Sequence, residues 1–196
     1  MTRLVLIRHG VTMWNKEGRY CGRKDINLSP QGRAQAKKLG RRLKSIRFDK
    51  IYSSDRKRAR QTGRIVFGGA DICAVRELAE IDFGALEELR HEEIMKKYAD
   101  SYKKWLKDPY KNNIPEAEPM NAFKKRVTSA LKRIVRLNPD KTVAVVCHGG
   151  VIGVFVNSVL KVSNFWRYIP SSASITIVEH ARGKAKLRKF NDTKHL

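Results

Sequence analysis

Two histidines of this sequence each follow a short apolar segment and are each followed by glycine. The first segment, LVLI at residues 4–7, ends in Arg8-His9-Gly10, and the second, VAVVC at 143–147, ends in His148-Gly149-Gly150. Continuous apolar runs of this length are typical of strands buried on both faces of a sheet. Polar residues placed directly after such strands are candidates for a functional site.

The residue types indicate chemistry on a phosphate group. Candidate members are Arg8, His9, Arg58 and His148, together with Asn15 and Glu80. Converging cations and hydrogen-bond donors would form a pocket for a dianion, because the planar guanidinium group matches phosphate oxygens. A neutral imidazole there can act as a nucleophile, and a carboxyl group can protonate the leaving oxygen. The arginines would stabilise the developing charge, so this chemistry needs no metal.

Strands and helices alternate along the chain. Strands are predicted at 4–7, 50–54, 72–75, 143–146 and 175–178, and helices at 30–47, 55–67, 88–107, 120–137 and 151–160. This alternation predicts an α/β fold, a three-layer sandwich with a mostly parallel central sheet and helices on both faces. Ligands of such sheets bind beyond the carboxyl ends of the strands. If the strands at 4–7 and 143–146 are neighbours, His9 and His148 meet at that edge.

Length and composition limit the remaining possibilities. A chain of 196 residues predicts one domain, residues 1–196, and no apolar run approaches the ~20 residues of a membrane span. The three cysteines, Cys21, Cys73 and Cys147, show no metal-ligand spacing and favour a reduced, cytoplasmic protein. Side-chain alternation along the strand before His148 predicts that Cys147 points into the core.

The net charge of +23, from 42 Lys and Arg against 19 Asp and Glu, indicates attraction to anions. The basic residues are spread over many segments, and the sequence shows no basic tail and no motif that reads RNA or DNA. We therefore do not expect specific nucleic-acid binding. A noncatalytic protein that binds phosphate or polyanions remains an alternative.

Five motifs, in order, resemble those of the histidine phosphatase superfamily, the phosphoglycerate mutase-like proteins. The resemblance covers nearly the whole chain. Its motifs are LVLIRHGVTMWN (4–15), DINLSPQGRAQA (25–36), IYSSDRKRARQT (51–62), LAEIDFGALEE (78–88) and VVCHGGVIG (145–153). The family resemblance implies a phosphoglycerate mutase-like fold and metal-independent chemistry without a cofactor.

Catalytic roles follow from this resemblance. It implies that His9 accepts the phosphoryl group and that His148 assists at the same phosphate. It also implies that Glu80 protonates the leaving group and then activates water, with Asp82 as the alternative acid.

The resemblance further implies a substrate-binding set. Its members are Arg8, Asn15, Arg58 and Gly149. Within the basic cluster at 56–60, only the register of the motif selects Arg58. The expected partner is a small phosphorylated metabolite, and a homodimer remains open.

The resemblance alone leaves two activities open. Family mutases carry a longer insertion between the acid and the second histidine, whereas Glu80 and His148 here are 68 positions apart. We therefore expect a compact phosphatase that acts through a phosphohistidine intermediate, like those acting on α-ribazole phosphate or phosphoserine. A cofactor-dependent phosphoglycerate mutase is the alternative. A helical and loop lid is expected at about residues 85–120.

Overall fold

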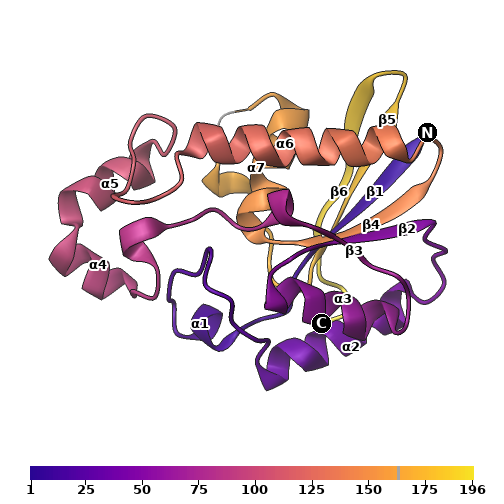
Figure 1. The fold of residues 1–196 in the computed structure, drawn as a ribbon, viewed down its shortest axis with the longest axis horizontal. Coiled ribbons are helices and arrows are strands. Elements are labelled where there is room, and N and C mark those ends of the chain that lie inside the picture. The colour runs from indigo at the N-terminus through magenta and orange to yellow at the C-terminus, as the bar shows by residue number, and fades with distance from the viewer. Residues whose placement is uncertain (163) are drawn as a thin grey trace.

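A computed structural model describes residues 1–162 and 164–196 of the chain. In this part of the chain a six-stranded sheet has the strand order β3-β2-β4-β1-β5-β6. Strands β3, β2, β4 and β1 run parallel, whereas β5 is antiparallel to both β1 and β6. Helices α6 and α7 cover one face of the sheet, and α2 and α3 cover the other (Figure 1). The predicted three-layer α/β sandwich with a mostly parallel sheet is confirmed.

The strands and helices alternate as the sequence indicates. The strands are β1 (Thr2–Arg8), β2 (Lys50–Ser54), β3 (Cys73–Val75), β4 (Thr142–Cys147), β5 (Ile175–Ala181) and β6 (Lys184–Asp192). The α-helices are α1 (Met13–Lys16), α2 (Pro30–Leu43), α3 (Lys57–Phe67), α4 (His91–Lys97), α5 (Ala99–Lys107), α6 (Met120–Leu137) and α7 (Gly149–Leu160). Short 3₁₀ helices are η1 (Arg76–Leu78), η2 (Gly84–Leu86) and η3 (Trp166–Tyr168).

Strand β1 contributes apolar side chains to both faces of the sheet. Leu4 and Leu6 belong to the core under α6 and α7, whereas Val5 and Ile7 belong to the core under α2 and α3. All four side chains are at most 1% exposed. Burying each one contributes about 1.5–3 kcal/mol. A strand buried on both faces must be apolar at successive positions, which explains the LVLI run.

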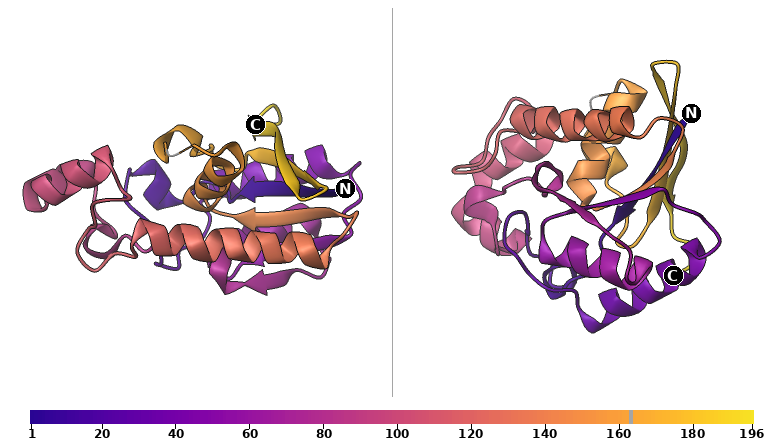
Figure 2. Two further views of the ribbon diagram at one scale, coloured as in Figure 1. Left: turned by 90° about the horizontal axis from the view of Figure 1, so that it is seen from above. Right: turned by 45° about the vertical axis from the view of Figure 1, so that its right-hand side comes forward.

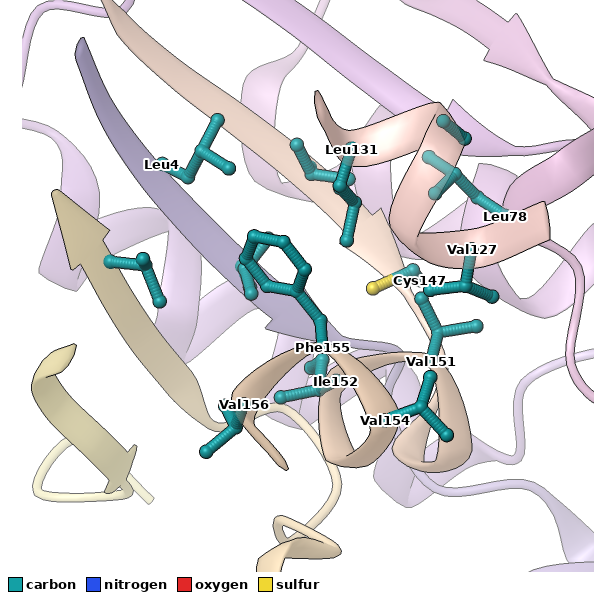
Figure 3. Packing of buried hydrophobic residues seen from close by; sticks show 14 of the residues in the cluster. Leu4, Leu78, Val127, Leu131, Cys147, Val151, Ile152, Val154, Phe155 and Val156 are labelled. Atoms are coloured by element: carbon teal, nitrogen blue, oxygen red, sulfur yellow. The ribbon is translucent and has the colours of Figure 1, made fainter. Parts of the chain in front are cut away.

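The largest core lies between the sheet and helices α6 and α7. In Figure 3, Phe155 of α7 lies between Leu4 of β1 and Leu131 of α6, and Ile152 belongs to the same helix and core. Cys147 is fully buried in the same core, as its place in the strand predicts. This packing fixes the start of α7, and therefore His148, relative to the sheet.

Helices α4 and α5 form a separate small cluster. They lie at the end of the molecule opposite the N-terminus (Figure 2). Their apolar side chains, which include Ile94, Tyr102 and Trp105, pack with Leu86 of η2 rather than with the sheet. The helix predicted over residues 88–107 is interrupted at Tyr98, whose φ of −135° and ψ of 27° are not helical.

The C-terminal region differs from the sequence prediction. The last strand predicted from the sequence ends at residue 178, but residues 184–192 form a further strand, the edge strand β6. Its exposed positions include Lys184, Lys186 and Arg188, so the polar face hides the strand pattern. Lysine on an edge strand discourages pairing with another chain. Among the helices of the described residues, none combines the length and apolar character that crossing a bilayer requires.

Candidate active site

The two histidines predicted to meet lie side by side at the carboxyl ends of β1 and β4. These strands are parallel neighbours, and Arg8 pairs in register with Cys147. The next residue of each strand is therefore a histidine at the same edge of the sheet. The ring centroids of His9 and His148 are 5.2 Å apart, and the ring planes form an angle of 63°.

His9 is held in one tautomer. Its Nδ1 lies 2.7 Å from the carbonyl oxygen of Gly10, which can only accept, so Nδ1 carries the proton and donates it. The Nε2 lone pair is therefore available for attack. Burial, followed by the positive charges of Arg58 and Arg8, lowers the pKa of His9 well below its usual value. The ring is consequently neutral at physiological pH and can act as a nucleophile.

Gly10 allows the close approach that supports this tautomer. A Cβ at residue 10 would lie 2.5 Å from the backbone oxygen of Gly32 at the start of α2, so a side chain does not fit. The backbone N–H of Gly10 donates to Thr62 Oγ1 at 3.1 Å. The residue after His9 is thus fixed by both α2 and α3.

His148 is fully buried and hydrogen-bonded to the end of β2. Its Nε2 lies 2.9 Å from Ser54 Oγ, and the same oxygen accepts the backbone N–H of Arg56. The serine hydroxyl can donate to Nε2, and in that tautomer the ring proton of neutral His148 lies on Nδ1. Nδ1 is buried and has no partner within the described residues. A buried, unpaired donor is costly unless a ligand accepts from it, so Nδ1 suits an anion.

Arg58 is buried at the start of α3, with 1% of the residue exposed. Its guanidinium group donates to the backbone oxygens of Lys24 at 2.9 Å and Gly22 at 2.8 Å. The loop at residues 21–24 therefore fixes the position of the side chain. The neighbouring Arg60 is exposed, as expected for most cations of this cluster.

Arg8 places a second guanidinium group beside the histidines. It donates to the backbone oxygen of Pro170, and its Nε is buried without a partner in residues 1–162 and 164–196. Burial lowers the pKa of Arg8, and nearby Glu80 opposes this shift. The atoms Nε and Cζ would lie 3.3 Å from a Cβ at Gly149, so glycine makes room for the guanidinium group.

Glu80 lies against the N-terminus of α7. Its carboxylate accepts the backbone N–H of Gly150 at 2.9 Å and that of Ile81 at 3.1 Å. Burial raises the pKa of Glu80 above its usual value, and these bonds and Arg58 only partly oppose it. Asp82, the alternative acid, instead accepts the Gly84 N–H and pairs with Arg23.

The side-chain NH₂ group of Asn15 is oriented by hydrogen bonds to the side-chain oxygen. The side-chain oxygen accepts from the backbone N–H and the hydroxyl of Thr12, both at 3.0 Å, in a capping box at the start of α1. The oxygen is therefore occupied, and the NH₂ group remains available to donate.

Some of these groups line a cavity of about 290 Å³. Its lining includes four of the predicted site residues, which are Arg8, Asn15, Glu80 and Gly149. His9, Arg58 and His148 are not part of the lining and are at most 4% exposed. The cavity is completed by Gly18, Arg19, Tyr20, Cys21, Phe83, Gly150, Phe165, Trp166 and Ile169.

Sequence reasoning missed two residues that position the site. Ser54 orients His148, and the only signal for it was its place at the end of a predicted strand. Arg126 donates to the backbone oxygens of Glu77, Ala79 and Glu80 and pairs with the carboxylate of Glu118. Arg126 thereby fixes the segment that carries the acid, although in sequence it is one cation of a basic run.

The described residues show no group of three or more His, Cys, Asp or Glu side chains that could hold a metal ion. The ionisable groups at the site are instead two arginines, one carboxyl group and two histidines whose pKa values are lowered by burial. Such a set binds an anion through guanidinium and imidazole donors.

Fold and cavity together define an α/β protein with a candidate anion-binding site at the carboxyl edge of its sheet. The chain belongs to the histidine phosphatase superfamily (branch 1), whose family model matches residues 4–193. This match confirms the family resemblance of the five motifs. It also confirms the expectation that the protein is a phosphatase, a hydrolytic enzyme.

Three relatives illustrate the similarity. Phosphoserine phosphatase 1 of Hydrogenobacter thermophilus is 31% identical and matches 100% of this chain and 95% of its own length. "Probable phosphoglycerate mutase GpmB" of Citrobacter koseri is 32% identical but matches 82% of this chain and 75% of its own length. The solved structure of Bacillus stearothermophilus YhfR is 30% identical, with a TM-score of 0.94, and the match covers 100% of this chain and 99% of that one.

Proposed function

We propose that this chain hydrolyses small phosphate monoesters through a phosphohistidine formed on His9, without a metal ion. One observation carries the proposal: a buried, neutral His9 has its Nδ1–H bound to Gly10 and its Nε2 lone pair free, beside His148. Arg8, which precedes His9 in the chain, lines the cavity, so we place the phosphate of an entering monoester between Arg8 and this lone pair.

In the first step, Nε2 of His9 attacks phosphorus and the bond from phosphorus to the ester oxygen breaks. Glu80 donates its proton to the departing oxygen, so that an alcohol leaves rather than an alkoxide. The raised pKa of Glu80 favours the protonated form that this step needs. The phosphoryl group is then bound to Nε2.

In the second step, the Glu80 carboxylate takes a proton from a water molecule as its oxygen attacks phosphorus. The bond from phosphorus to Nε2 breaks, inorganic phosphate leaves, and both His9 and protonated Glu80 are restored. One carboxyl group therefore serves as acid and then as base.

The phosphoryl oxygens would be held by donors that the fold has already oriented. Arg8 and Arg58 supply guanidinium groups, His148 supplies Nδ1–H, and Asn15 supplies its NH₂ group. The 12-residue helix α7 starts at Gly149, and its N-terminus favours negative charge. Such preorganised donors stabilise the transition state without reorganising during the reaction.

Hydrolysis is favoured over mutase activity by the extent of the matches. The phosphoserine phosphatase relative is covered almost completely, whereas a quarter of the mutase relative has no counterpart here. The α4–α5 segment, together with the loops around it from about residue 85 to 120, is the proposed lid over the cavity.

The test is phosphate release from p-nitrophenyl phosphate, combined with detection of a phosphorylated peptide by mass spectrometry after acid-free quenching. His9→Ala is expected to abolish both signals, whereas His180→Ala, which removes an imidazole beside Thr2 at the other end of β1, keeps both. Turnover that survives His9→Ala contradicts the proposal. Formation of 2-phosphoglycerate from 3-phosphoglycerate with its bisphosphate, faster than release of phosphate, identifies a mutase.

A further inference from the structure

Beyond the groups that would hold the phosphate, the cavity is walled mainly by apolar and aromatic side chains. These are Tyr20, Phe83, Phe165, Trp166 and Ile169. The leaving alcohol of a bound monoester would occupy this region, since the phosphate is held on the side of Arg8 and Asn15. The chemistry of the wall therefore selects the alcohol.

The polar atoms of the aromatic residues are already paired with residues outside the cavity lining. Tyr20 shares a hydrogen bond between its hydroxyl and that of Tyr102 at 2.8 Å. Trp166 donates its Nε1–H to the backbone oxygen of Leu106 at 2.9 Å. These residues consequently offer ring surfaces to a ligand rather than hydrogen bonds.

The cation at this end of the cavity is also engaged. Arg19 donates its Nε–H to Glu17 at 2.7 Å and an NH1 proton to the backbone oxygen of Glu88 at 2.7 Å, and it pairs with Glu93 at 3.5 Å. The bond to Glu17 is the main cause that raises the pKa of Arg19. The charge of Arg19 is thus balanced by the protein itself.

Arg8 is the other cation in the described lining, and it lies on the phosphate side. Its guanidinium group packs at Gly149 and is bound to Pro170. A carboxylate on the leaving alcohol would therefore lose water without gaining an unengaged cation. Burying a charge in this way is costly.

The aromatic wall is held in place by further ring contacts. Edge-to-face pairs join Tyr20 to Phe83 with centroids at 4.9 Å, and Trp166 to Trp105 of α5 at 5.0 Å. Such pairs add to the stability gained from burial alone. A wall that is ordered before binding needs little rearrangement to receive a ring.

We propose, building on the hydrolase function above, that the preferred substrates are phosphate monoesters of uncharged alcohols that carry a flat ring or a similarly bulky apolar group. Phosphates of amino acids and hydroxy acids are then poor substrates. This chain therefore differs in substrate class from the phosphoserine phosphatase to which it is similar. The 290 Å³ cavity is large enough for a ring-sized group next to the phosphate.

The experiment compares 2-phenylethyl phosphate with O-phospho-L-serine by phosphate release. Both compounds release a primary alkyl alcohol, so a preference reports recognition rather than leaving-group reactivity. We expect kcat/KM to be at least about tenfold higher for the phenylethyl ester, the scale of one aromatic contact plus burial. A higher kcat/KM for phosphoserine overturns this inference but leaves the hydrolase function intact. If none of these three esters, p-nitrophenyl phosphate included, releases phosphate, the hydrolase function itself is contradicted.

Two variants locate the source of the preference. Trp166 is 37% exposed, so Trp166→Ala is expected to fold, and it should lower kcat/KM about tenfold for the phenylethyl ester with little change for phosphoserine. Phe48→Ala removes an aromatic ring packed against the core beside α2 and α3, outside the cavity lining, and should change both substrates equally. An equal loss on both substrates in Trp166→Ala, with an unchanged melting temperature, contradicts the assignment of the wall.

Discussion

Replacing Glu80 with glutamine tests the proton donor of the proposed mechanism. Glu80 is 8% exposed, and its carboxylate accepts the Gly150 N–H at 2.9 Å. A glutamine side-chain oxygen can accept the same N–H, whereas its NH₂ group cannot accept the N–H of Ile81. Glu80→Gln therefore removes the transferable proton and keeps one of the two backbone hydrogen bonds. The effect must therefore depend on how much the leaving group needs a proton.

The magnitude follows from the role of a general acid. Positioned acids contribute roughly 10²–10⁴-fold where the leaving group needs the proton. We expect Glu80→Gln to lower kcat/KM about 10³-fold for 2-phenylethyl phosphate and less than about tenfold for p-nitrophenyl phosphate. A difference of about 10²-fold between the two substrates corresponds to about 2.7 kcal/mol of transition-state stabilisation.

The parameter kcat/KM is the appropriate one because it covers only the steps up to formation of the phosphoenzyme. Hydrolysis of the phosphohistidine, in which Glu80 acts as base, contributes to kcat but not to kcat/KM once phosphoryl transfer is irreversible. Equal losses of kcat/KM on both esters would refute Glu80 as the acid and would indicate a purely positional role.

The same variant has a defined pH dependence. Burial raises the pKa of Glu80, and the acid is active when protonated, so kcat/KM of the unmodified protein for the alkyl ester falls as pH rises through this raised pKa. Glu80→Gln should lack that decline. A raised folded-state pKa also means that Glu80 contributes stability at low pH that is lost as pH rises. The melting temperature of Glu80→Gln relative to the unmodified protein should therefore increase toward high pH.

Two further substitutions test the geometry of the site. Gly150→Ala would place a Cβ 2.4 Å from Glu80 Oε1, so the carboxyl group must move. We therefore expect kcat/KM for alkyl esters to fall at least about tenfold. The control Gly69→Ala, where a Cβ meets open space, should have no effect. Unchanged activity in Gly150→Ala would contradict the described position of the carboxyl group. Arg58→Lys keeps the charge but loses the planar guanidinium group and its bonds to backbone carbonyls. We expect kcat/KM to fall about 10²-fold for every ester. The control Arg60→Lys, at an exposed residue of the same helix, should change kcat/KM little. A loss confined to one ester would show that Arg58 contacts the alcohol rather than the phosphate.

The parts of the fold that the sequence predicted are those with strong local patterns. The continuous apolar run before Arg8-His9 defines a strand, and the apolar positions of α6, which recur every three or four residues, define a helix. Neither assignment needs the rest of the chain. The predicted helix from residue 30 likewise begins at Pro30, with Ser29 as its cap. Strand β6 was missed because one of its faces is basic and its pairing with β5 is a tertiary property.

The site was predictable only as far as its residues follow strand ends or lie in motifs. His9 and His148 follow strands, so the edge of the sheet brings them together. The cradle of Arg58 could not be predicted, because it consists of backbone carbonyls of a loop at residues 21–24 that carries no side-chain signal. The ion pair between Arg19 and Glu93 likewise could not be predicted, because only folding brings these two residues together.

The position of β1 between β4 and β5 has a consequence for synthesis on the ribosome. The strand that leads to His9 emerges before both of its partners, because its two hydrogen-bonding edges pair with strands in residues 142–181. Until then, a very apolar segment lacks partners and is exposed to aggregation or to chaperones. We expect ribosome-bound fragments that end before β4 to be unable to assemble the histidine pair, so that phosphatase activity arises late in translation.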